Sequence, residues 1–97
     1  MKRGRMRFHV HHTHLYPGAR LTALDGRLAS AGAVILEFSD GAGSVGQYER
    51  NAEGTLTLHV APYRTMAGTP LPAKHWRLVA TGDANIWRVD RKLDADA

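Results

Sequence analysis

Apolar side chains recur at every second position in several short segments of the chain. The clearest example is residues 55–61, where Leu56, Leu58 and Val60 alternate with polar residues. A period of two places successive side chains on opposite faces of a β-strand, so that one face can pack into a core. Alternating or β-branched apolar segments predict further strands over residues 5–16, 33–38, 45–50, 75–80 and 85–91.

Glycine, proline and asparagine separate these segments at short intervals. Pro17-Gly18, Asp40 to Gly43 and Asn51 to Gly54 all have turn chemistry. Short strands separated by turns are typical of barrels and sandwiches, and no alternation of strands with long helical segments is present. The pattern therefore predicts an all-β fold, a small antiparallel barrel or sandwich of about six or seven strands built from hairpins.

The stretch 19–31 fits two local structures. Asp25-Gly26 lies between two apolar segments, which is the pattern of a two-residue hairpin turn. Leu21, Leu24 and Leu28 instead keep helical spacing, although Gly26 would cost a helix about 1 kcal/mol. A hairpin is the preferred prediction, and one short helix near residues 20–31 is the alternative.

The length of 97 residues predicts one domain, residues 8–92, with a frayed tail at 93–97. The formal net charge is +4. Without a predicted flexible arm at residues 1–7, nine basic and nine acidic residues remain, so the excess charge belongs to the arm, to Lys2, Arg3, Arg5 and Arg7. No apolar run has the length of a membrane helix or follows the pattern of an export signal, which predicts a cytoplasmic protein with no membrane partner.

Gly41, Gly43 and Gly46 form a G-x-G-x-x-G motif after a predicted strand. A dinucleotide site requires a helix to begin at these glycines, and no helical pattern follows them. No nucleophile and base occur in a recognisable arrangement either. The sequence therefore predicts no cofactor, no catalytic residues and no enzyme.

Histidines concentrate near the N-terminus, at positions 9, 11, 12 and 14. In a strand, His9 and His11 would share one face, and two such imidazoles can bind a divalent metal. A metal site would need a third ligand, for which His59 is the first candidate, with His75 and Glu37 as alternatives. Several neighbouring histidines would also charge together near pH 6.5, which predicts that acid loosens the first strand.

The long proline-rich segment 62–74 is predicted to be a loop, and basic and aromatic residues alternate at its ends. Tyr63 and Arg64 open this loop, and Lys74 and Arg77 follow it. Aromatic rings beside arginines can hold single-stranded nucleic acid, and the basic arm would add phosphate contacts. Against this, Trp76 and Trp87 are in register with apolar neighbours, which predicts that both lie in the core.

The preferred hypothesis is a small non-enzymatic binding or accessory module that acts through protein–protein contacts. The charged first strand is expected to be an exposed edge that can pair with another chain, including a second copy of this one. The alternatives are a nucleic-acid-binding barrel, which would use the arm and the 63–77 region, and a His-x-His metal-binding protein. Tyr63, Arg64, Lys74 and Arg77 are the candidate binding residues.

Overall fold

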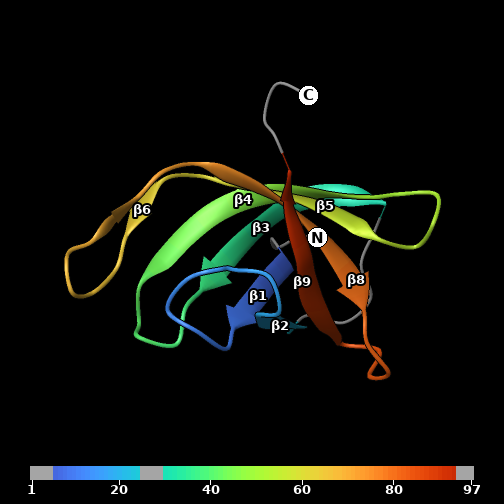
Figure 1. Cartoon of the computed structure of the whole chain (residues 1–97), viewed down its shortest axis with the longest axis horizontal. Helices are drawn as coiled ribbons and strands as arrows, with labels where there is room; N and C mark the ends of the chain where they lie inside the picture. The colour runs from blue at the N-terminus through green and yellow to red at the C-terminus, as the bar shows by residue number, and fades with distance from the viewer. Residues whose placement is uncertain (1–5, 25–29, 94–97) are drawn as a thin grey trace, which may run out of the picture.

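A computed structural model describes residues 6–24 and 30–93 and shows a closed β-barrel with no helix in these ranges (Figure 1). The strands are β1 (Met6–Val10), β2 (Arg20–Ala23), β3 (Ala31–Glu37), β4 (Gly43–Arg50), β5 (Leu56–Val60), β6 (Tyr63–Arg64), β7 (Pro70–Leu71), β8 (Lys74–Ala80) and β9 (Ile86–Leu93). Seven of them close the barrel in the order β1-β2-β9-β8-β5-β4-β3, and β6 and β7 form a separate hairpin. The predicted all-β barrel is confirmed.

One pair of barrel strands departs from the antiparallel expectation. β1 and β3 run parallel, with Phe8 opposite Leu36, while the other neighbouring pairs of the barrel are antiparallel. This pairing closes the ring, because β2 occupies one side of β1 and β3 occupies the other. The expectation that the first strand is an exposed edge is therefore wrong, since both of its sides are paired.

The same topology decides the ambiguous segment near residues 20–31. Residues Arg20–Ala23 form a strand rather than a helix, and its neighbours are β1 and β9. A hairpin between β2 and the following strand is therefore not formed. The Asp25-Gly26 turn, and the rest of the alternative helix up to residue 29, lie outside the described residues.

Several boundaries of the strands and of the domain differ from the prediction. β1 ends at Val10, so His11–His14 lie in a bend and not in a long strand to residue 16. The loop then returns along β9, because the Gly18 N–H donates to the Val89 carbonyl at 2.8 Å and the Val89 N–H donates to the Ala19 carbonyl at 2.8 Å. Arg7 lies within β1 and Leu93 within β9, so both belong to the barrel.

The segment 62–74 is not a structureless loop. Tyr63 pairs with Leu71 and Arg64 with Pro70, which forms the hairpin β6–β7 that projects to one side of the barrel (Figure 1). Gly68 at its tip has a φ of 92°, a backbone conformation that glycine adopts without strain. The hairpin carries Met66, whose side chain is 68% exposed.

Side chains from all seven barrel strands fill the interior. Trp76 and Trp87 are 4% and 7% exposed, which confirms the prediction that both indoles belong to the core. Leu15, from the loop after β1, is buried with them. Twelve core residues lie on the strands beside the indoles: Phe8, Val10, Leu21, Ala23, Val34, Leu36, Tyr48, Leu56, Leu58, Val60, Leu78 and Val89.

Candidate binding surface

The four candidate residues of the 63–77 region do not form one site. Tyr63 and Lys74 line a small cavity of about 30 Å³ beside Leu71. Arg64 donates to the carbonyl of Gly68 at 3.1 Å, within its own hairpin. The structure therefore brings Tyr63 and Lys74 together at this cavity, whereas Arg64 and Arg77 are not part of its lining.

Tyr63 has a packing role in this structure. Its ring stacks on that of Phe38, with the centroids 4.4 Å apart and the planes 14° from parallel. Its hydroxyl donates to the carbonyl of Thr13 at 2.9 Å. Burial, followed by the negative charge of Asp40, raises the pKa of Tyr63 to about 12. The ring joins the hairpin to the barrel and is not presented as a stacking platform.

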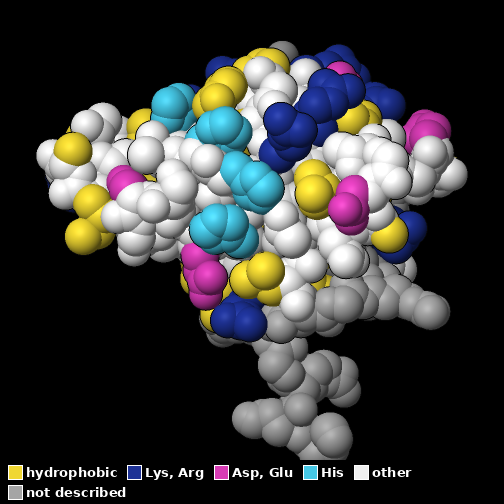
Figure 2. Space-filling view, turned by 90° about the horizontal axis from the view of Figure 1, so that it is seen from below, with side chains coloured by type: hydrophobic (Ala, Val, Ile, Leu, Met, Phe, Trp, Pro, Cys, Tyr) yellow, Lys and Arg dark blue, Asp and Glu magenta, His cyan; other side chains and the backbone are white. Residues whose placement is uncertain are grey.

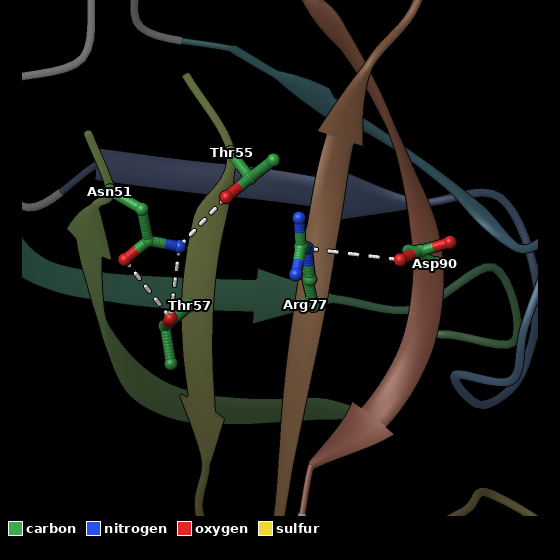
Figure 3. A network of polar contacts seen from close by, with 5 residues as sticks. All are labelled: Asn51, Thr55, Thr57, Arg77 and Asp90. Carbon is green, nitrogen blue, oxygen red and sulfur yellow. Dashed lines mark hydrogen bonds and ion pairs between the residues drawn. The ribbon is translucent and has the colours of Figure 1, made fainter. Parts of the chain in front are cut away.

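Arg77 is engaged in an ion pair at an irregularity of the barrel. The register between β8 and β9 shifts at Arg77/Leu78, and Asp90 lies beside Arg77, with 3.8 Å between Nε and Oδ2 (Figure 3). The Nε atom is buried without a hydrogen-bond partner. In the turn between β4 and β5, the amide of Asn51 donates to the hydroxyl of Thr55 at 2.8 Å, and it also donates to the hydroxyl of Thr57 on β5 at 3.2 Å (Figure 3). These contacts join strands to one another and do not prepare Arg77 to bind a partner.

The predicted metal ligands are separated by the barrel. His9 and His11 lie near the end of β1, whereas His59 lies on β5, with β3 and β4 between them. No group of three or more His, Asp or Glu residues that could hold a metal occurs within residues 6–24 and 30–93. The His9–His11–His59 site is therefore not formed. The alternative third ligand Glu37 does lie opposite His9, but it pairs with Arg7, with 3.7 Å between the charged atoms.

A row of basic side chains runs from the bend after β1 across β2 and β9 on the outer face of the barrel. The N–H of His11 donates to the carbonyl of Arg20 at 3.0 Å, and Arg20 lies directly opposite Arg88 in the pairing of β2 with β9. Both arginines alternate with buried residues and are exposed. Neither forms an ion pair with any residue in the described part of the chain. Like charges directly opposite each other destabilise a sheet, so this pair is costly in the free protein.

Histidines extend this row of basic side chains toward the loop after β1. Partial burial, followed by the charges of His9, His12 and Arg20, holds the pKa of His11 below its ordinary value of 6.5. The Nε2 atom of His11 is 2.7 Å from the hydroxyl of Thr22. Figure 2 shows histidine side chains in a band across this face, with lysine and arginine side chains beside it.

An aromatic residue lies beside the histidines. Tyr16, 37% exposed, packs against the rings of His12 and His14, each with a centroid distance of 5.1 Å. Its hydroxyl lies 3.0 Å from Nδ1 of His12. Tyr16 falls within the strand predicted over residues 5–16, but the strand ends at Val10 and Tyr16 lies in the loop that follows it. Together, His11, His12, His14, Tyr16, Arg20 and Arg88 are called the His–Arg face below.

Sequence reasoning missed this surface although it found most of the histidines. The alternation of residues in β2 and β9 places Arg20 and Arg88 on the outside, but it does not show that the two strands are neighbours. Lys2, Arg3 and Arg5 of the predicted arm lie outside the described residues.

Comparisons with family models, with curated proteins and with solved structures return no match. Within the described residues, no helix has the length and apolar character needed to cross a membrane.

Proposed function

We propose that this chain is a small non-enzymatic binding module that docks an acidic segment of a partner protein on its His–Arg face. The observation that carries the proposal is the direct opposition of Arg20 and Arg88 without an ion pair. A carboxylate between the two guanidinium groups would relieve their repulsion and accept hydrogen bonds from both. The proposed partner thus supplies the charge that this face lacks.

The composition of the face favours a protein partner. Tyrosine and arginine are enriched among the residues that dominate binding energy at protein interfaces. The Gly18–Val89 and Val89–Ala19 hydrogen bonds hold the loop that carries Tyr16 against β9, the strand that carries Arg88. Nucleic acid remains the alternative, with the arm contributing phosphate contacts. It is less favoured because both indoles are buried and Tyr63 is stacked on Phe38, so these rings do not offer stacking platforms.

The test is the binding of fluorescent polyglutamate and of an oligothymidylate to the full chain at about 50 and about 200 mM salt. We expect polyglutamate to bind at the lower salt and to weaken at the higher. Arg20→Glu and Arg88→Glu should each abolish binding. Arg64→Glu makes the same change in net charge on the β6–β7 hairpin, outside the His–Arg face, and should retain it.

The same variants separate binding from folding. Arg20→Glu places a carboxylate opposite Arg88, and a cross-strand pair of opposite charges contributes about 0.2–1 kcal/mol. We therefore expect this variant to melt at the same or a higher temperature than the wild type while losing its partner. Binding of oligothymidylate alone would replace this proposal with the alternative, and binding of neither probe at the lower salt would refute both.

A further inference from the structure

Two histidines that do not belong to the His–Arg face lie directly opposite each other on β5 and β8. His59 pairs with His75 in the register, and Gln47 on β4 pairs with His59. All three alternate with inward-facing residues, so they occupy consecutive positions in one outward row across three strands. The row therefore presents two imidazoles and a carboxamide to the same part of the surface.

The two imidazole rings face each other through the same nitrogen. Nδ1 of His59 is in contact with Nδ1 of His75, and the ring centroids lie 4.6 Å apart with the planes 76° from parallel. Both side chains are half-buried. A neutral imidazole offers one lone pair on its unprotonated nitrogen, and two such nitrogens can converge on one cation.

A hollow of about 370 Å³ opens beside this pair. Its lining includes Gln47, His59 and His75, together with the small residues Gly46, Ala61 and Ala73. The small residues leave room beside the rings, and the hollow is open to solvent. Space is thus present for the water molecules or external ligands that would complete the coordination of a metal.

We propose that His59 and His75 form an open binding site for a divalent transition-metal cation such as Zn²⁺, with Nδ1 of each ring as ligand. Imidazole nitrogen suits zinc, copper and nickel, and open zinc sites keep positions for water or substrate. Gln47 lines the same hollow and is the candidate for an oxygen ligand. This site is independent of the proposed docking function, because it lies on different strands.

The other histidine pair is less suited to a cation. The ring centroids of His9 and His11 are 5.6 Å apart, and Nε2 of His11 already contacts the hydroxyl of Thr22. Arg20 beside His11 would also repel a metal ion. The His9–His11 pair therefore serves as the matched control.

The experiment is a titration of ZnCl₂ into the full chain, prepared without a histidine tag and treated with chelator, followed by NMR of the histidine rings. We expect the ring resonances of His59 and His75 to shift together at the first equivalent of zinc. Losing a group that merely positions a ligand costs about 10–100-fold in affinity, so His59→Gln and His75→Gln should each weaken this site at least about 10-fold.

The double variant H9Q/H11Q should bind zinc at His59 and His75 as the wild type does. A circular dichroism spectrum of each variant checks that the barrel is folded. The proposal is overturned if the rings of His59 and His75 do not respond to zinc, which would leave them as a hydrogen-bonded pair. It is also overturned if H59Q leaves the zinc response of His75 unchanged.

Discussion

The carboxylate of Asp40, in the turn between β3 and β4, accepts a hydrogen bond from the backbone N–H of Met66 with 3.1 Å between Oδ2 and N. Its other oxygen, Oδ1, accepts from the N–H of Ala42 at 2.9 Å. Asp40 and Met66 are 26 positions apart in the chain, and the hydrogen bond between them attaches the projecting hairpin to the barrel. One side chain thus holds both its own turn and the tip of β6–β7.

Replacing Asp40 should loosen the hairpin before it affects the barrel. Asp40→Asn keeps one carbonyl oxygen and can satisfy only one of the two N–H groups, whereas Asp40→Ala satisfies neither. We expect faster amide hydrogen exchange at Met66 in both variants and at Ala42 in the alanine variant. Exchange at Leu58, in the middle of β5, is the internal control. Unchanged exchange at Met66 in Asp40→Ala would contradict the role given to this contact.

Acid should have the same effect as the Asp40 variants. The hydrogen bond from Ala42, followed by that from Met66, holds the pKa of Asp40 below its ordinary value. A carboxyl with a lowered pKa in the folded state stabilises the fold above the unfolded value of about 3.9, and this contribution is lost as pH falls through the lower folded value. Exchange at Met66 should rise over that range in the wild type and change less in Asp40→Asn.

Tyr63 should make the protein sensitive to alkali. Its pKa is raised to about 12, so the stability gained by keeping the phenol neutral is complete below about pH 10 and is lost as pH rises through 12. Tyr63→Phe keeps the stack on Phe38 and loses the hydrogen bond to Thr13, which costs about 0.5–1.5 kcal/mol at neutral pH. Urea melts across this pH range should show a smaller alkaline loss in Tyr63→Phe than in the control Tyr16→Phe.

Gly46 should not tolerate a side chain. It pairs with Val60 across β4 and β5, and a Cβ atom at this position would overlap the backbone carbonyl oxygen of His59. Gly46→Ala must therefore displace one strand from the other, and overpacking of this kind costs about 1–3 kcal/mol or more. At Gly82 a Cβ would meet no atom within 4 Å, so Gly82→Ala is the control in a thermal melt. Equal melting temperatures for the two variants would contradict the close approach of the strands.

His11 should lower the stability of the barrel in mild acid. Its pKa is below 6.5 in the folded state, first through burial and then through the neighbouring cations, so the unfolded chain binds the proton more readily. Stability is therefore greatest above pH 6.5 and falls as pH decreases through the folded value. Thermal melts at about pH 7.5 and about pH 5 should differ in the wild type and differ less in His11→Gln. The control is His14→Gln, because among the described residues the side chain of His14 is hydrogen-bonded only to its chain neighbour Thr13.

The G-x-G-x-x-G motif shows how one local pattern can arise from unrelated causes. Gly41 has a φ of 95° in the turn after β3, whereas Gly46 is required inside β4 by the nearness of His59. The spacing resembles that of a nucleotide-binding loop, but Gly41 and Gly46 are each required for a separate steric reason. The requirement at Gly41 is local to its turn, whereas the requirement at Gly46 becomes visible only when the neighbouring strand is in place.

The alternation of Leu56, Leu58 and Val60 was enough to predict a strand and its buried face, because side-chain direction in a strand depends only on the local backbone. The same reasoning placed Trp76 and Trp87 in the core and led to a small barrel or sandwich. Such patterns did not predict which strands are neighbours in the barrel. Four contacts join residues that are distant in the chain. They are the parallel pairing of β1 with β3, the opposition of Arg20 to Arg88, the hydrogen bond between Asp40 and Met66, and the facing rings of His59 and His75. These contacts depend on how the barrel closes, and closure is a property of all seven strands together.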